Sequence, residues 1–258
     1  MWWRILLRLQ KGEIMKLEHM TVTGADDITN VRGMIELSKE YPFLEWGILF
    51  PLSGGSRFPT SEWLAHLLEE KGKIPMNLSA HLCGGDLDDA LENKSKINLD
   101  PFKRIQLNFH GLNYYQIVMK SVTDTEMTLF TVEKFLESVS NKKVIFQFDG
   151  VNDGWIYNYL DNGSFSNIQY LFDTSSGAGV LPNTFPMPYK DVTCGFAGGI
   201  GPNNIDNVVD TLKQTLSPTK PFWIDMETRV RTDGDLDLNK VAQCADIVAR
   251  EVFGRHAI

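Results

Sequence analysis

Residues that can give or take protons follow several short apolar runs of the sequence. Asp149 closes the run KVIFQF, Asp173 closes NIQYLF, and His81 and Cys83 lie together in SAHLC. Carboxyl, imidazole and thiol side chains are the usual general acids and bases of enzymes. These four residues are therefore candidates for acid–base catalysis. The alternative is that each of them only packs at, or caps, the end of a strand.

Glycine-rich segments also follow apolar runs, and they are typical of anion sites. Gly198 and Gly199 lie in AGGIGPNNI, ahead of a segment of helical period. Glycines let backbone N–H groups approach an anion, and the dipole at a helix N-terminus favours negative charge. The segment predicts either a phosphate cradle or a tight turn that uses glycine only for its backbone freedom.

The acidic residues could instead hold a divalent cation through oxygen and nitrogen ligands. The candidate ligands are Asp149, Asp173, Asp225, Glu227 and His81. They lack a compact ligand spacing, so we expect no resident metal, and a metal-assisted hydrolase or lyase stays an alternative. The turn TGADD has one glycine where a dinucleotide-binding fingerprint has three, so we expect no cofactor.

The composition describes an ordinary folded protein with an acidic balance. The 258 residues are 43% hydrophobic and 22% charged, and 25 basic against 33 acidic residues give a net charge of −8. These values exclude a disordered chain and a collagen, and they argue against nucleic acid or an anionic membrane as the main partner. The three cysteines are widely spaced with no CxxC pair, so we expect reduced thiols and a cytoplasmic location.

Apolar runs alternate with segments of helical period along most of the chain. Eight such alternations in a chain of this length favour a (β/α)8 TIM barrel over an open doubly wound sheet. Chemistry in such a barrel belongs at the carboxyl ends of the strands, where the candidate residues lie. We expect strands at 19–24, 45–50, 76–82, 104–109, 143–148, 167–172, 192–197 and 221–226, and helices at 27–39, 60–70, 131–140, 203–216 and 238–252.

The beginning of the chain stands apart from this alternation. It mixes basic residues with Trp and Leu, and its longest uncharged apolar run is Ile5–Leu7. A signal peptide needs about 7–15 apolar residues and a membrane span about 20. We therefore expect no membrane segment. We expect an N-terminal extension over 1–16, with an amphipathic helix as the alternative, and one barrel domain over 17–258.

Six segments occur in the order and at the spacing of a known family: TVTGADDITNV, GILFPLSGGSRFPTSEW, IQLNFHG, YLFDTSSGAG, GFAGGIGPNNI and WIDMETRVRTDGDLDLNKV. In this pattern the chain resembles phosphoribosylanthranilate isomerase, a (β/α)8 barrel enzyme of tryptophan biosynthesis. The resemblance runs from about residue 17 to the C-terminus. Its most specific pieces are the S-x-R loop, the D-T-x-x-G-x-G turn and the A-G-G-x-x-P-x-N loop.

The resemblance implies roles for four positions. Asp173 matches the general acid that opens the aminosugar ring of the family's substrate. Arg57 matches the arginine that holds a carboxylate, and a planar guanidinium suits a bidentate pair with that group. Gly198 and Gly199 match the backbone donors to the substrate phosphate. The alternatives are that Asp173 caps its own turn and that Arg57 is solvated in a loop.

Two positions depart from the family pattern. Thr23 stands where the family has the cysteine that acts as general base, and a neutral hydroxyl needs an activating partner to take a carbon-bound proton. Glu227, beside Thr228, stands where a small serine contacts phosphate. Two unit charges ~4 Å apart interact by about 4 kcal/mol at an effective dielectric of ~20. Either Glu227 points elsewhere, or Arg229 or Arg231 neutralises it, or the ligand has no phosphate there.

These observations predict an isomerase-like barrel enzyme that transfers protons on a small anionic substrate similar to a sugar phosphate. Asp173 is the proposed donor, and the base is sought among Asp149, His81 and Cys83, with Thr23 at the position of the family's base. The substrate-binding set is Arg57, Gly198, Gly199, Glu227, Thr228 and Arg229. The alternative from another class is a non-catalytic phosphosugar-binding or regulatory barrel. We expect a monomer or a homodimer without nucleic-acid or membrane partners.

Overall fold

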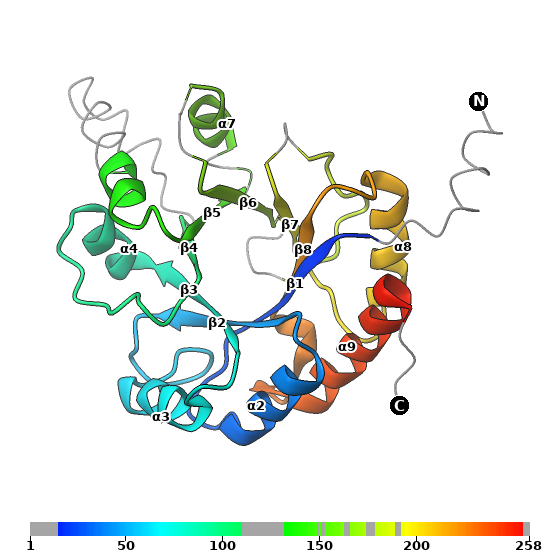
Figure 1. Cartoon of the computed structure of the whole chain (residues 1–258), viewed down its shortest axis with the longest axis horizontal. Coiled ribbons are helices and arrows are strands. Elements are labelled where there is room, and N and C mark those ends of the chain that lie inside the picture. Colours follow the sequence, from blue (N-terminus) through cyan, green and yellow to red (C-terminus); the bar gives the residue numbers. More distant parts are fainter. Residues whose placement is uncertain are drawn as a thin grey trace.

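Eight parallel strands close into a barrel that follows the order of the chain, with helices around its outside (Figure 1). The structure is a computed structural model, and it describes residues 15–109, 132–148, 150, 153–162, 166–173, 179–188 and 192–254. The predicted (β/α)8 barrel is confirmed. The predicted N-terminal extension lies outside the described residues except for its last two positions.

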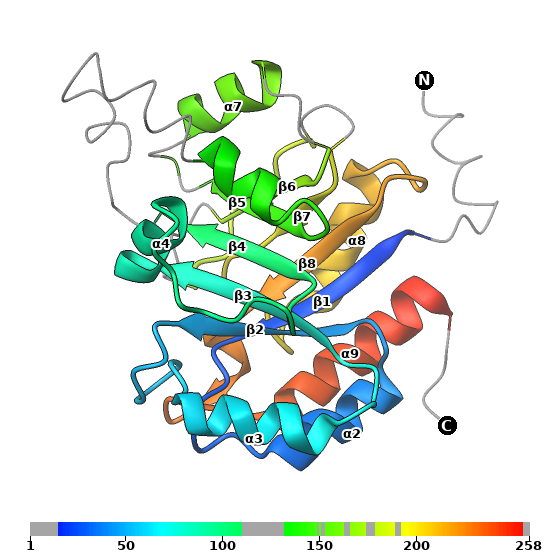
Figure 2. The same ribbon diagram turned by 60° about the vertical axis from the view of Figure 1, so that its left-hand side comes forward.

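Each strand of the barrel begins within two residues of its expected start. The strands are rich in Val, Ile, Leu and aromatic residues and are buried on both faces, as in other parallel sheets. Figure 2 shows the barrel from another side. The strands are β1 Leu17–Thr23, β2 Leu44–Phe50, β3 Asn77–Cys83, β4 Arg104–Asn108, β5 Lys143–Phe148, β6 Ile168–Phe172, β7 Cys194–Phe196 and β8 Phe222–Met226.

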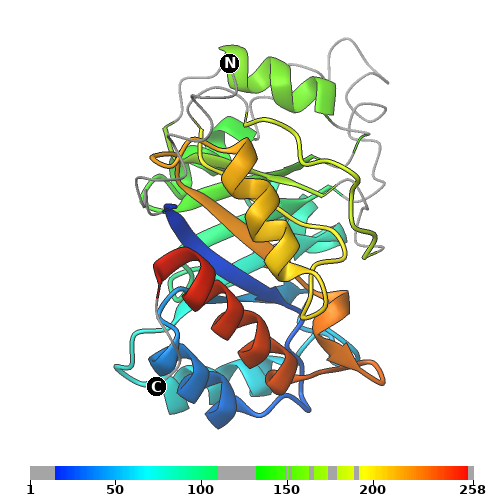
Figure 3. The ribbon, with the colours of Figure 1, turned by 90° about the vertical axis from the view of Figure 1, so that its right-hand side faces the viewer.

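The helices pack against the outside of the barrel, where α8 and α9 lie along β1 and β8 (Figure 3). Side chains satisfy their first N–H groups, since Asn30 caps α2, Thr60 caps α3 and Asp237 caps α9. Among the described residues, none of the helices has the length and apolar character needed to cross a bilayer. The helices are α2 Val31–Glu40, α3 Ser61–Lys71, α4 Gly84–Leu91, α7 Asp153–Asn162, α8 Ile205–Thr215 and α9 Leu238–Phe253, with a further helical segment at 132–138.

The two faces of the strands differ in polarity. Outward-facing side chains such as Trp46 and Phe146 belong to the main apolar core between the barrel and the helices. Inside the barrel, the apolar cluster is small and consists of Ile145, Leu171, Ala197 and Trp223. The other described inward positions are mostly polar. The interior therefore forms a polar column that runs between the two ends of the barrel.

Candidate active site at the carboxyl end of the barrel

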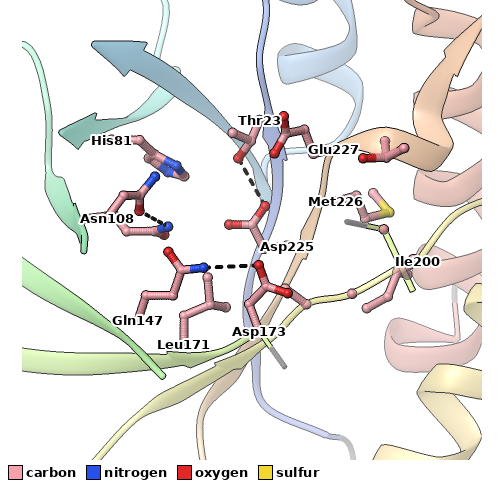
Figure 4. A pocket seen from close by; sticks show the side chains of 16 residues that line it. Thr23, His81, Asn108, Gln147, Leu171, Asp173, Ile200, Asp225, Met226 and Glu227 are labelled. Atoms are coloured by element: carbon pink, nitrogen blue, oxygen red, sulfur yellow. Dashed lines mark hydrogen bonds between the residues drawn. The ribbon is translucent and has the colours of Figure 1, made fainter. Parts of the chain in front are cut away.

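A polar pocket opens inside the barrel at the carboxyl ends of the strands (Figure 4). It measures about 500 Å³, including its open side. Three of its described lining residues are acidic and none is Lys or Arg. Those lining residues are Thr23, His81, Gln106, Asn108, Gln147, Leu171, Asp173, Gly179, Ala197, Gly198, Gly199, Ile200, Asp225, Met226, Glu227 and Thr228.

Two aspartates lie in the pocket, at the ends of β6 and β8. Asp173 accepts an N–H from Gln147 on β5, with 3.0 Å between Nε2 and Oδ2. Asp225 accepts the hydroxyl of Thr23 on β1, with 3.0 Å between Oγ1 and Oδ1. Figure 4 shows both carboxyl groups on the same side of the pocket. Each carboxyl group is therefore held by a side chain from the adjacent strand, as the positioning of a proton-transfer group requires.

Burial determines the protonation of Asp225. This residue is 7% exposed, and the loss of hydration raises its pKa well above the usual 3.8. The hydrogen bond from Thr23 opposes this increase, whereas the charges of Glu227 and Asp173 reinforce it. Asp225 therefore keeps its proton at a pH where an exposed aspartate is ionised, which is the property of a general acid.

His81 is a neutral imidazole in this environment. Burial lowers its pKa to about 4, against the opposing charge of Glu45. Gly47 on β2 leaves the space that the imidazole occupies, because a Cβ there would lie 2.8 Å from His81 Nε2 and 2.6 Å from Thr23 Oγ1. His81 and Thr23 therefore converge over Gly47 within the pocket. With so low a pKa, His81 is a weak base near neutral pH.

Cys83 ends β3 but is not among the residues that line the pocket. Its Sγ accepts an N–H from Asn108 at 3.2 Å. Burial nevertheless raises the pKa of the Cys83 thiol to about 11. At neutral pH the residue is a thiol and lacks the thiolate that takes protons. These properties weigh against the proposal that Cys83 replaces the family's base.

Glu227 forms an ion pair with Arg57 at the edge of the pocket. Their atoms Oε1 and Nη1 lie 2.6 Å apart. Arg57 has a φ of +74°, which is uncommon for a residue other than glycine, and its backbone N–H donates to Asp26 Oδ2 at 2.8 Å. The guanidinium that we predicted to clamp a substrate anion is thus occupied by a carboxylate of the same chain.

The other two arginines of this region have different partners. Arg231 is buried and donates from Nη2 to Asp26 at 3.1 Å and from Nη1 to the carbonyl of Gly24 at 2.7 Å. Arg229 is exposed and does not line the pocket. Burial raises the pKa of Glu227 above its usual value, and the direct contact with Arg57, with a weaker contribution from Arg231, opposes this increase.

Glycines also line the pocket, where the segments after β6, β7 and β8 meet. A Cβ at Gly199 would lie 2.5 Å from the carbonyl oxygen of Gly179, and a Cβ at Gly179 would lie 2.9 Å from Cβ of Thr228. Gly198 and Gly199 have φ values of +107° and +57°. This close packing is a structural reason for glycine at 199. Phosphate binding by Gly198 and Gly199 stays a prediction.

The structure adds amide side chains that the sequence analysis did not single out. Gln106 donates to Asn108 Oδ1 at 2.6 Å, and Gln147 supports Asp173. The alternation of polar and apolar residues in RIQLN and KVIFQF was a signal that could have placed them inside the barrel. Asp149, the remaining predicted base, lies outside the described residues.

A metal site does not emerge from the residues that the structure describes. Within that part of the chain, no three His, Cys, Asp or Glu residues form a group that could hold an ion. Asp173, Asp225 and Glu227 nevertheless share the pocket lining. These acidic residues have partners within the chain, and among them Asp225 accepts the hydroxyl of Thr23 and Glu227 forms an ion pair with Arg57.

The barrel is similar to solved structures of enzymes. N-(5'-phosphoribosyl)anthranilate isomerase from Pyrococcus furiosus superposes with a TM-score of 0.51 at 11% identity, over 93% of this chain and 100% of that one. A truncated 3-deoxy-D-arabino-heptulosonate 7-phosphate synthase from Thermotoga maritima gives 0.52 at 11% identity, over 95% and 90% of the two chains. The likeness is one of fold. Neither a protein-family model nor a curated protein sequence matches the chain.

Proposed function

We propose that the protein is an enzyme that moves protons between Asp225, Asp173 and a small hydroxylated substrate in the mouth of the barrel. The observation that carries this proposal is the raised pKa of Asp225, whose buried carboxyl group lines the pocket with Asp173. A protonated acid and a carboxylate in one pocket are the two groups that an isomerisation or an epimerisation needs.

In this mechanism Asp225 and Asp173 have complementary roles. Asp173 removes a proton from a carbon next to a carbonyl or imine, while Gln147 holds its carboxylate in position. Asp225 donates its proton to the oxygen or nitrogen that gains electrons, and Thr23 orients this group. This step gives an enol or enamine; Asp173 then returns its proton to the neighbouring carbon and an oxygen or nitrogen of the intermediate returns one to Asp225, which completes the isomerisation without an oxidant and restores both groups. This assignment moves the donor role from Asp173, where the family resemblance places it, to Asp225.

The finer proposal concerns the substrate and the family. The resemblance to phosphoribosylanthranilate isomerase supports a sugar-phosphate-like substrate, with the phosphate at Gly198, Gly199 and Thr228. Thr23 and the ion pair between Arg57 and Glu227 support a substrate that differs from that of the family, since the base is replaced and the carboxylate clamp is occupied. We therefore propose a divergent member with altered substrate choice.

Exchange of carbon-bound hydrogen with solvent tests the proposal without knowledge of the product. The purified protein is incubated in D2O with ribose 5-phosphate, fructose 6-phosphate and phosphoribosylanthranilate, and deuterium incorporation is followed by NMR. We expect incorporation into at least one compound and a loss of at least 100-fold in both Asp173→Asn and Asp225→Asn. Asp210→Asn, on the outer helix α8, is the matched control and keeps the wild-type rate.

The alternative class, a binding or regulatory barrel, gives a different result. It predicts saturable binding of a sugar phosphate in calorimetry together with no exchange at any pH. Exchange that persists in both aspartate variants would contradict the roles of Asp173 and Asp225.

A further inference from the structure

A second cavity lies at the amino-terminal ends of the strands, at the opposite end of the barrel from the candidate active site. It measures about 1190 Å³, including its open side. Its basic residues come from the starts of β4 and β5, and its other lining residues come from β1 and from the segments leading into β6 and β7. We call this cavity the floor site and define it by Glu18, His19, Lys103, Arg104, Lys143 and Gln169.

At the bottom of the floor site lies a buried arginine that has no hydrogen-bond partner among the described residues. Arg104 is 2% exposed, and its Nε, Nη1 and Nη2 donate to no described acceptor. Its nearest carboxylate is that of Glu45, with 3.6 Å between Nε and Oε2, and its guanidinium stacks 4.1 Å from the ring of Trp223. A buried guanidinium with unsatisfied donors is energetically costly, so a group that accepts its hydrogen bonds stabilises this arrangement.

Two other buried polar atoms of the floor site have no partner in the described part of the chain. They are Nδ1 of His19 and Oε1 of Gln169, and Gln169 is 4% exposed. The first can donate as the neutral tautomer and the second can only accept. Together with Arg104, the His19 donor fits a ligand with several acceptor oxygens, and the Gln169 oxygen also accepts a hydroxyl where the ligand has one, as monohydrogen phosphate does.

The charge of the floor site agrees with this chemistry. Lys103 and Lys143 are exposed at its rim and Arg104 lies at its base, whereas Glu18 is the acidic residue of the lining. Three positive charges against one negative charge leave an excess of positive charge in a protein whose overall net charge is −8. Glu45 offsets part of the charge of Arg104 from within the barrel. The cavity therefore selects for a small anion.

We propose that the floor site binds a small oxyanion, with Arg104 at its base and Lys103 and Lys143 at its rim. The ligand class is a phosphate monoester or a dicarboxylate, because planar guanidinium donors and ammonium groups bind both. The site is separate from the pocket that contains Asp173 and Asp225. The proposal therefore does not depend on the reaction at the carboxyl end of the barrel.

Calorimetric titration of the full chain tests the floor site with inorganic phosphate, succinate and, as the reference anion, chloride at equal ionic strength. We expect phosphate or succinate to bind saturably, and the one that binds identifies the ligand chemistry. The double variant Lys103→Ala/Lys143→Ala is expected to weaken this binding at least tenfold. The matched control Lys39→Ala/Lys73→Ala removes the same charge from exposed positions outside the floor site and keeps the wild-type affinity.

A second variant tests the role of Arg104 at the bottom of the floor site. Arg104→Met combined with Glu45→Gln removes both buried charges together, so that no lone charge is left inside the barrel. Binding is expected to be lost in this variant, and if it does not fold, the lysine variants decide. The proposal is overturned if phosphate and succinate bind no better than chloride. It is also overturned if the Lys103→Ala/Lys143→Ala variant binds like the wild type, because the anion then occupies another site, such as Gly198 and Gly199.

Discussion

Replacement of Asp225 by asparagine is expected to change how the stability of the protein depends on pH. The folded-state pKa of Asp225 is raised above 3.8, so the protonated form is the one that folding favours. Its contribution to stability is therefore fully present below about pH 4 and decreases as pH rises toward the folded-state pKa. The asparagine of the variant does not titrate, and its side-chain oxygen can still accept the hydroxyl of Thr23.

The magnitude follows from linkage. Between the unfolded and folded pKa values, each pH unit removes about 1.4 kcal/mol of the free energy of unfolding from the wild type. The variant does not lose this free energy. Asp225→Asn should therefore gain stability relative to the wild type by about 1.4 kcal/mol per pH unit above pH 4, until the folded-state pKa is reached.

Urea unfolding at several pH values between 4 and 8 measures this difference directly. Gly85→Ala, which changes no titrating group, is the control and should follow the wild type in parallel at every pH. A constant difference between Asp225→Asn and the wild type over the whole range would refute the reasoning. It would show that Asp225 is ionised in the folded protein and is not the acid of the proposed mechanism.

Three further perturbations have defined outcomes. Glu227→Ala frees the guanidinium of Arg57, and because this pair is partly exposed we expect benzoate binding to strengthen by only about tenfold, or ~1.4 kcal/mol, in an NMR titration. Gly47→Ala forces a methyl group against the side chains of Thr23 and His81 and should lower the free energy of unfolding by about 1–3 kcal/mol in urea titrations. Cys83, with a pKa of about 11, should react slowly with iodoacetamide at pH 7 and faster as pH approaches 11, as measured by mass spectrometry.

Each of these perturbations has its own control. Benzoate binding that persists in a Glu227→Ala/Arg57→Asn double variant would show that benzoate does not bind at Arg57. Asparagine is used there because it tolerates the positive φ of that position. Gly85→Ala has open space around its new methyl group and should not destabilise, so equal losses at 47 and 85 would contradict the packing argument. Rapid alkylation of Cys83 at pH 7 would show a thiolate.

The strands could be predicted closely because each combines an apolar outer face with a short length between turns. The helices α4 and α7 were missed for local reasons. Both helices have glycine in the first turn, two in GGDLDDAL and one in DGWIYNYLDN, and glycine has low helix propensity; in addition, no side chain caps α4. Packing against the barrel, which the sequence alone does not show, stabilises them.

Site residues whose position depends on a single strand could be predicted from the sequence. Asp173, Gly198 and Gly199 could be placed at the carboxyl end of the barrel from their positions after apolar runs. The residue pairs that determine the charges of the site could not be predicted, because their members come together only when the barrel closes. Thr23 and Asp225 are 202 positions apart, and Arg57 and Glu227 are 170 apart. Burial, which raises the pKa of Asp225, depends on the same closure.

The excess of positive charge in the floor site affects how anions reach the protein. At the amino-terminal end of the barrel this charge creates a local field that guides anions before any contact is made. At the carboxyl end, Arg57 offsets the charge of Glu227 and Asp225 keeps its proton, so the field there is weaker. Added salt shortens the range of the field to about 10 Å at 0.1 M, so it should slow the capture of anions at the floor site.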